Sequence, residues 1–106
     1  MLFRSAYRGR YMAHDPVCFA ALNRSIARPH VTHLGKEIGK PTMVVAGRFD
    51  KVRPPAASEQ FAKTIPGARF ELIDAVHMMP AQAPGPLLKL LQDFLGAQAA
   101  ARQHAN

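Results

Sequence analysis

The sequence predicts an α/β fold built on a parallel βαβ unit. Residues 42–46 (TMVVA) form a nearly unbroken apolar run, which is typical of a strand buried on both faces. Residues 69–73 (RFELI) alternate in polarity, as a strand with one outward side does. A helical segment lies between the two runs, so the strands are expected to be parallel and joined by a right-handed crossover. The carboxyl ends of both strands then lie at the same edge of the sheet.

A helix over residues 16–27 is predicted ahead of the sheet. Asp15 is a favourable N-cap, and Pro16 suits the first helical position. The apolar residues that follow have helical spacing: Cys18, Phe19, Leu22 and Ile26. The pair Arg28-Pro29 ends this helix, and residues 30–40, which include two glycines, form a predicted connector.

Two further helices are predicted around the second strand. One begins at Pro54-Pro55 and ends near Thr64, before Pro66-Gly67, with four side chains facing inward: Ala57, Phe61, Ala62 and Ile65. The other begins at Pro86 and carries a broad apolar stripe: Leu87, Leu88, Leu91, Phe94 and Leu95. The Ala/Gln-rich tail after Gly96 is expected to fray.

Length and composition restrict the class of protein. A chain of 106 residues, about half of them apolar, holds one small domain or a piece of a larger one. The single Cys18 allows no internal disulfide, which fits a reducing compartment. The sequence contains no apolar run of membrane-span length, and its first residues lack the pattern of a secretory signal. We therefore expect a cytoplasmic protein that does not bind membranes.

The net charge of +7 is concentrated near the amino terminus. Residues 1–40 carry seven Lys/Arg and two Asp/Glu, giving +5, whereas residues 41–106 carry seven and five, giving +2. Tyr7 and Tyr11 lie among these basic residues, which is one pattern of nucleic-acid binders. A solvated or partner-facing arm is the favoured interpretation, and nucleic-acid binding is kept as an alternative.

Two polar residues follow the predicted strands. Asp50 comes just after the first strand and His77 just after the second. A carboxylate that accepts a hydrogen bond from an imidazole fixes its tautomer and stabilises the imidazolium formed in catalysis. Asp74 is a second carboxylate near His77, and we interpret it as a surface or turn residue. The pattern predicts an Asp50–His77 pair at the edge of the sheet.

The sequence around Asp50 and His77 resembles the carboxyl-terminal segment of α/β-hydrolase fold enzymes. "KPTMVVAGRFDKVRPP" is similar to the family pattern P-T-apolar-apolar-G-x-x-D-x-apolar-x-P, and "IPGARFELIDAVH" is similar to the helix end, strand and histidine that follow it. The similarity covers about residues 38–95, and the layout is most similar to the enol-lactonase and haloperoxidase-like branch. The resemblance implies that Asp50 is the triad acid and His77 the triad base, in the family order.

The resemblance also implies a division of the chain. Residues 1–37 would form a basic arm and a cap-like helix with its connector. Residues 38–106 would form the carboxyl-terminal part of the core, with its last two strands and last helices. The expected fold is thus a partial α/β-hydrolase fold.

A nucleophile is missing from this pattern. The family places its serine in a G-x-S-x-G elbow, and none of the three serines here has the glycines: Ser5, Ser25 and Ser58. Cys18 lies within a predicted helix. We therefore expect a hydrolase-family chain (an esterase, lactonase or similar) that is inactive alone. The alternatives are a non-catalytic assembly module derived from the fold and, less favoured, a nucleic-acid-binding protein.

Other residues near the pair have two interpretations. Arg48 and Arg53 flank Asp50 and either bind an anionic substrate or are solvated loop charges. Met78 and Met79 follow His77 and either line a substrate pocket or pack in the loop. Gln82 stands where the family often has Glu, which indicates altered packing of the histidine loop.

We expect no cofactor and no metal. Three histidines could suggest a metal site (His14, His30 and His33), but a connector with exposed histidines is favoured because no cluster completes a four-ligand set.

The strand patterns also predict a partner besides a small-molecule substrate. The first strand has the composition of a sheet interior, and in this chain it lacks a neighbour on its far side. An open strand edge promotes pairing with another chain. We expect either the missing part of a hydrolase or a second copy to cover this edge, so that the chain is not a free monomer.

Overall fold

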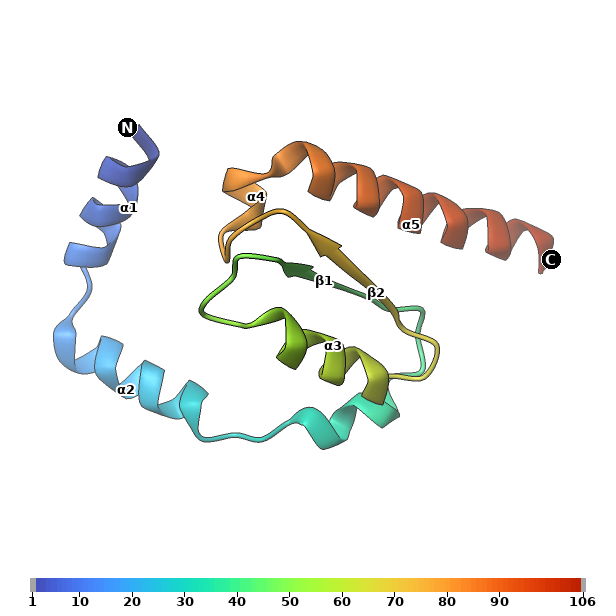
Figure 1. Cartoon of the computed structure of the whole chain (residues 1–106). Helices are drawn as coiled ribbons and strands as arrows, with labels where there is room; N and C mark the ends of the chain where they lie inside the picture. Colours follow the sequence, from blue (N-terminus) through green and yellow to red (C-terminus); the bar gives the residue numbers. More distant parts are fainter. Residues whose placement is uncertain (1, 106) are drawn as a thin grey trace. The chain divides into compact units, whose positions relative to one another are not determined.

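The computed structural model describes residues 2–105, which divide into two compact units (Figure 1). The first unit comprises residues 2–30 and the second residues 31–105. The boundary predicted after residue 37, between a cap-like region and the core, stays a prediction.

The first unit consists of two helices, α1 (Leu2–Met12) and α2 (Pro16–Ala27). The predicted cap of α2 is confirmed: the Asp15 carboxylate accepts a hydrogen bond of 2.9 Å from the Cys18 N–H, and Pro16 is the first helical residue. Edge contacts of Phe19 with the rings of Tyr11 (5.3 Å between centroids) and His14 (5.1 Å) join the end of α1 to the start of α2.

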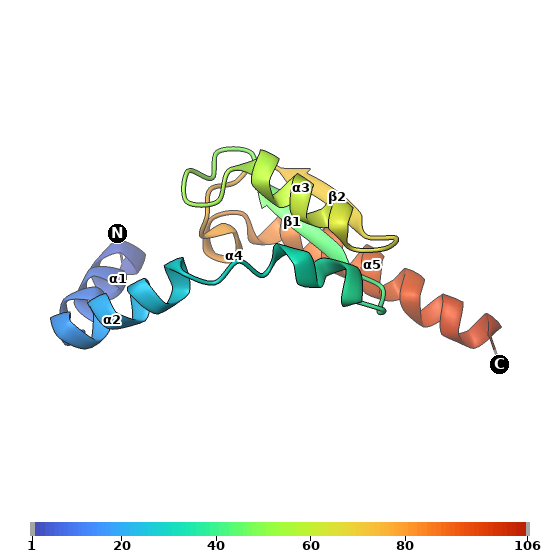
Figure 2. The same cartoon turned by 90° about the horizontal axis from the view of Figure 1, so that it is seen from below.

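The second unit is built on two strands, β1 (Met43–Gly47) and β2 (Arg69–Ile73). They pair in parallel, with Met43 opposite Arg69 and Gly47 opposite Ile73. Helix α3 (Pro55–Thr64) connects them, as predicted. Figures 1 and 2 show that α3 and the last helix, α5 (Pro84–His104), lie on opposite faces of the sheet. The predicted βαβ unit is therefore confirmed, with β1 starting and ending one residue later than expected.

A small core lies between the sheet and α3. Ala46, Ala62 and Ile65 are buried there, while Ala75 and Ala83 are buried in the segment between β2 and α5. No large side chain of the described residues is fully buried. Ala57, which was predicted to face inward, is exposed, because Ser58 on the neighbouring position of α3 takes the half-buried place.

The connector before β1 contains a 3-10 helix, η1 (Thr32–Glu37), that the sequence analysis did not predict. Gly35 in this helix is buried against α3, and a Cβ at that position would collide with the side chain of Thr64. The close approach requires glycine at this position.

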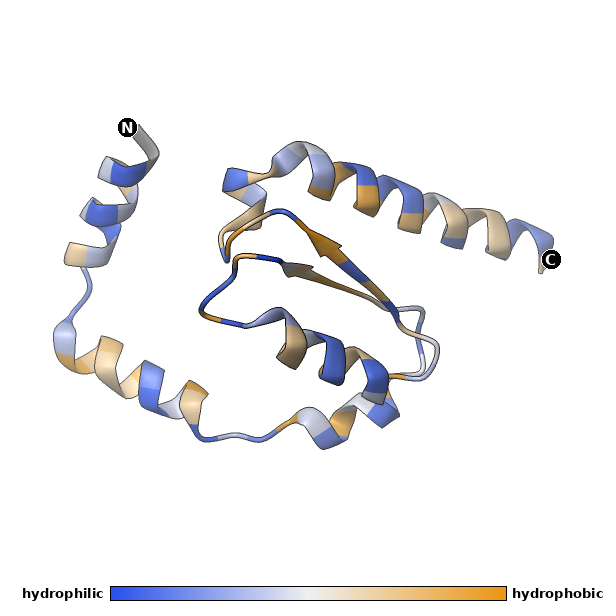
Figure 3. Ribbon diagram, in the orientation of Figure 1, coloured by the Kyte–Doolittle hydropathy of each residue, from blue (hydrophilic) through white to orange (hydrophobic). Residues whose placement is uncertain are grey.

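The carboxyl-terminal helix differs from its prediction. A short helix, α4 (Met79–Gln82), precedes α5, which begins at Pro84 rather than Pro86 and continues past Gly96 to His104. The tail after Gly96 is thus helical, because its alanines have high helix propensity. Figure 3 shows apolar segments along both strands and α5. Leu88, Leu91 and Leu95 of the predicted stripe remain exposed.

Over residues 2–105, no helix combines the length and the apolar character that crossing a membrane requires.

Candidate active site

The two loops that follow β1 and β2 are joined by backbone hydrogen bonds beyond the strands. The N–H of Arg48 donates to the Ile73 carbonyl (2.8 Å), and the N–H of Phe49 donates to the Ala75 carbonyl (3.0 Å). Gly47 permits this approach, because a Cβ at that position would lie 2.5 Å from the Ala75 oxygen. Ala75 is completely buried. The backbone thus places the residue after β1 beside the loop that follows β2.

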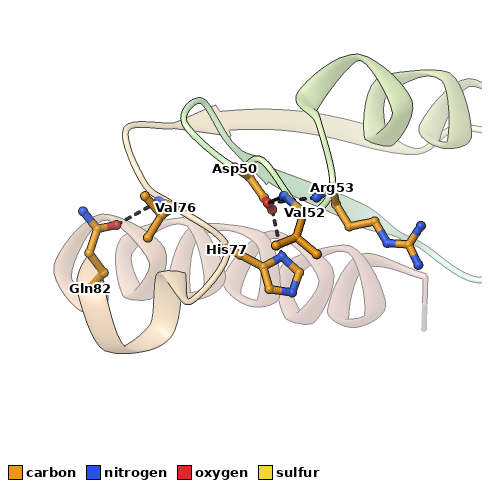
Figure 4. A network of polar contacts seen from close by, with 6 residues as sticks. All are labelled: Asp50, Val52, Arg53, Val76, His77 and Gln82. Carbon is orange, nitrogen blue, oxygen red and sulfur yellow. Dashed lines mark hydrogen bonds and ion pairs between the residues drawn. The ribbon is translucent and has the colours of Figure 1, made fainter. Parts of the chain in front are cut away.

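Asp50 is held in one orientation at the turn after β1 (Figure 4). One carboxylate oxygen, Oδ1, accepts hydrogen bonds from the N–H groups of Val52 (2.8 Å) and Arg53 (2.9 Å). The other oxygen, Oδ2, lies 3.0 Å from Nδ1 of His77. Asp50 is the buried charged residue of the described chain, at 8% exposure. A buried carboxylate with this many donors is an oriented hydrogen-bond acceptor.

The donors also fix the charge of Asp50. The Arg53 N–H lowers the pKa of Asp50 below its ordinary value of 3.8, and the hydrogen bonds from His77 and Val52 lower this pKa further. Burial of the carboxylate acts in the opposite direction and is outweighed. Asp50 is therefore ionised at neutral pH.

His77 contacts Asp50 through one ring nitrogen and leaves the other available. Its side chain is 49% exposed, and Figure 4 shows the second ring nitrogen on the side of the ring away from Asp50. An ionised carboxylate accepts but does not donate, so Nδ1 carries the proton and Nε2 of the neutral ring is an acceptor. This arrangement suits Nε2 to remove a proton from a neighbouring hydroxyl.

Of the other predicted site residues, Arg48 has a different partner. The guanidinium Nε of Arg48 lies 2.6 Å from the carboxylate of Asp74, and both side chains are exposed. Asp74 thus pairs with Arg48 rather than with His77. Met78 is exposed beside His77, and Met79 begins α4. A substrate-binding role for Arg48, Met78 and Met79 stays a prediction.

The structure also shows contacts near the pair that the sequence did not predict. Val52 and Arg53 act through their backbone N–H groups, which carry no residue-type signal. The side-chain oxygen of Gln82 accepts a hydrogen bond of 2.9 Å from the Val76 N–H, next to His77. Gly47 was visible only as the residue that ends an apolar run.

Among residues 2–105, no three His, Cys, Asp or Glu side chains lie together as ligands for a metal ion.

Solved structures resemble this arrangement of elements. An esterase from Thermogutta terrifontis, described as thermophilic and solved with malate bound, is 35% identical with a TM-score of 0.63, over 66% of this chain and 26% of the esterase. A hydrolase from Pseudomonas aeruginosa PA01 is 30% identical with a TM-score of 0.61, over 65% of this chain and 26% of the hydrolase. The chain carries part of an α/β-hydrolase fold. No protein-family model and no curated protein matches the sequence.

The part of this chain that matches spans about a quarter (26%) of each of these solved proteins. The fold that the sequence predicted is therefore confirmed as a partial one. The enol-lactonase and haloperoxidase-like branch stays a prediction, since the two structures are described only as an esterase and a hydrolase.

The lowered pKa of Asp50 predicts how the stability of the chain depends on acid pH. At a pH above 3.8, the ordinary pKa of an aspartate, ionised Asp50 stabilises the folded state. This contribution is lost as the pH falls through the lowered pKa that Asp50 has in the folded state. Between pH 5 and pH 2, we therefore expect the urea midpoint of Asp50→Asn, followed by circular dichroism, to fall less than that of the wild type. Asp93→Asn, which removes an exposed carboxylate from α5, is the control. Parallel curves for wild type and Asp50→Asn would contradict the assignment.

Proposed function

We propose that this chain supplies the acid and base residues of a hydrolase that cleaves an ester, lactone or similar acyl bond through a serine nucleophile. The observation that carries the proposal is the contact of 3.0 Å between His77 Nδ1 and Asp50 Oδ2. Asp50 is buried and fixed by two backbone N–H groups, while half of the His77 side chain is exposed. This combination gives an oriented imidazole with an accessible Nε2.

The two residues divide the chemistry as follows. His77 Nε2 takes the proton of the serine hydroxyl as its oxygen attacks the acyl carbon, and Asp50 stabilises the imidazolium that forms. The imidazolium then gives that proton to the leaving alkoxide, which departs as an alcohol and leaves an acyl-serine. In the second half, His77 takes a proton from water as the water attacks the acyl-serine, and it returns the proton to the serine oxygen.

The nucleophile is assigned to a polypeptide segment other than these 106 residues. Ser25 lies within α2 and donates its hydroxyl to the Ala21 carbonyl (2.9 Å), while Ser5 and Ser58 lie in α1 and α3. A catalytic serine needs a base and an oxyanion site beside it, and a strand-to-helix elbow provides the required exposure. A helix interior does not provide this geometry.

The proposed partner is a polypeptide that supplies the remaining part of the hydrolase fold, the part to which this chain has no counterpart. Within residues 2–105, β1 and β2 each have one hydrogen-bonded neighbour, so each leaves one edge free. An added strand beside β1 would satisfy the backbone groups along its apolar run. It would also bury surface that a unit without a fully buried large side chain needs to cover. A second copy of this chain at the same edge is the competing occupant.

A complementation experiment tests this function. The partner is the Thermogutta terrifontis esterase with its matched segment deleted, and the probe is a fluorophosphonate that labels activated serines. We expect no labelling of this chain alone, and labelling of the truncated esterase only in the mixture, where light scattering should show one copy of each. Labelling of Ser5, Ser25 or Ser58, lost in His77→Ala, would contradict the proposal. A mixture in which the chain associates only with itself would contradict the assigned partner.

A further inference from the structure

The loop that carries His77 is held on one side by β1 and on the other by α4. The Ala75 carbonyl accepts from the Phe49 N–H, and the Met78 carbonyl accepts from the N–H groups of Ala81 and Gln82 in α4. Between these anchors lie Val76 and His77. The Val76 N–H donates a hydrogen bond of 2.9 Å to a side-chain oxygen, Oε1 of Gln82 (Figure 4).

We propose that Gln82 is a positioning residue for His77, because its side-chain amide closes the seven-residue loop from Val76 to Gln82 and holds the backbone that aims the imidazole at Asp50. This inference deepens the proposed function and rests on it for its role in catalysis. The Val76 N–H belongs to the Ala75–Val76 peptide group, one residue before His77. Its direction therefore influences the course of the backbone that carries the His77 side chain. Without Gln82, the hydrogen bond to Asp50 is the remaining described restraint on an imidazole that is half exposed.

The chemistry of glutamine suits this place. An amide oxygen accepts a hydrogen bond without adding charge, so the contact does not depend on pH. Two carboxylates around the loop already have partners, since Asp74 pairs with Arg48 and Asp50 is hydrogen-bonded to His77. A glutamate at position 82 would keep an oxygen acceptor but would add a negative charge near this pair. The neutral amide therefore supports the loop and leaves Asp50 as the carboxylate bonded to His77.

The test uses the full chain and two readouts from nuclear magnetic resonance. Amide exchange at Val76 reports whether the loop is closed, and the ring nitrogen shifts of His77 near neutral pH report the share of the Nδ1–H tautomer. For Gln82→Leu we expect exchange at Val76 to become about two- to tenfold faster, as loss of one ordinary hydrogen bond predicts. We also expect the His77 Nε2–H tautomer to increase. Gln82→Glu should restore slow exchange, and Gln92→Leu, an exposed glutamine in α5, should match the wild type.

The outcomes distinguish this inference from the proposed function. If Gln82→Leu speeds exchange at Val76 but leaves the His77 tautomer unchanged, Gln82 is only structural and the inference is wrong. If neither readout moves, the side-chain contact itself is wrong. Asp50→Asn is the reference for the acid–base pair: a wild-type tautomer share in that variant would overturn the Asp50–His77 pair and the proposed function with it. A tautomer change in Asp50→Asn but not in Gln82→Leu would overturn the inference alone.

Discussion

Replacing His77 with alanine is expected to lower the turnover number of the complemented hydrolase by about 10⁴-fold or more, the range seen when a triad base or its acid partner is disabled. The imidazole is the group that removes the serine proton and later protonates the leaving alkoxide. Because His77 is half exposed and bonded to Asp50 alone among the described contacts, its loss should leave the fold intact. Hydrolysis of p-nitrophenyl acetate by the mixture measures the effect.

Two variants complete this experiment. Asp50→Asn should also lower turnover by about 10⁴-fold, because an asparagine can favour the wrong tautomer of the imidazole. His30→Ala removes an exposed histidine of the connector and should leave turnover at the wild-type level. If His77→Ala kept a tenth or more of the wild-type turnover number, His77 would not be the base.

Substituting alanine for Gly47 is expected to lower the free energy of unfolding by about 1–3 kcal/mol, as overpacking of a close contact does. The new Cβ would lie 2.5 Å from the carbonyl oxygen of Ala75, which is backbone and completely buried. Relief of this collision requires the loops after β1 and β2 to move apart. We therefore expect Gly47→Ala also to weaken the contact between Asp50 and His77.

Urea unfolding and the His77 ring nitrogen shifts measure both effects of Gly47→Ala. Gly39→Ala is the matched control, since a Cβ at Gly39 meets nothing within 4 Å. Equal stabilities of the two variants would show that the loops after β1 and β2 are not as tightly apposed as described.

The parts of the fold that follow from local chain patterns were predictable. The strand at residues 43–47 was found from an apolar run between Pro and Gly, and the strand at residues 69–73 from its alternating polarity. Helices α2 and α3 were found from the prolines at their starts, with Asp15 as the cap of α2. The pairing of Asp50 with His77 followed from one topological rule, that parallel strands bring their carboxyl ends together.

The parts that depend on weaker or longer-range signals were missed. Helix α1 carries three arginines and Gly9, a residue of low helix propensity, while the tail of α5 is helical through alanine propensity rather than periodicity. The contact of Gln82 with the Val76 N–H joins a side chain to a backbone group, and spacing alone does not specify such a bond. For the same reason, the donors Val52 and Arg53 could not be found from their side chains.

The position of Asp50 and His77 on one continuous βαβ unit has a consequence for assembly. The two residues are 27 positions apart, so the entropy of closing that loop is compensated within this chain and does not change with concentration. A serine on a separate polypeptide would instead meet them at a rate and occupancy set by mass action. On dilution, turnover per molecule should fall as the nucleophile dissociates, whereas the hydrogen bond between Asp50 and His77 should persist. The acid and base would thus remain paired through cycles of subunit dissociation and rebinding.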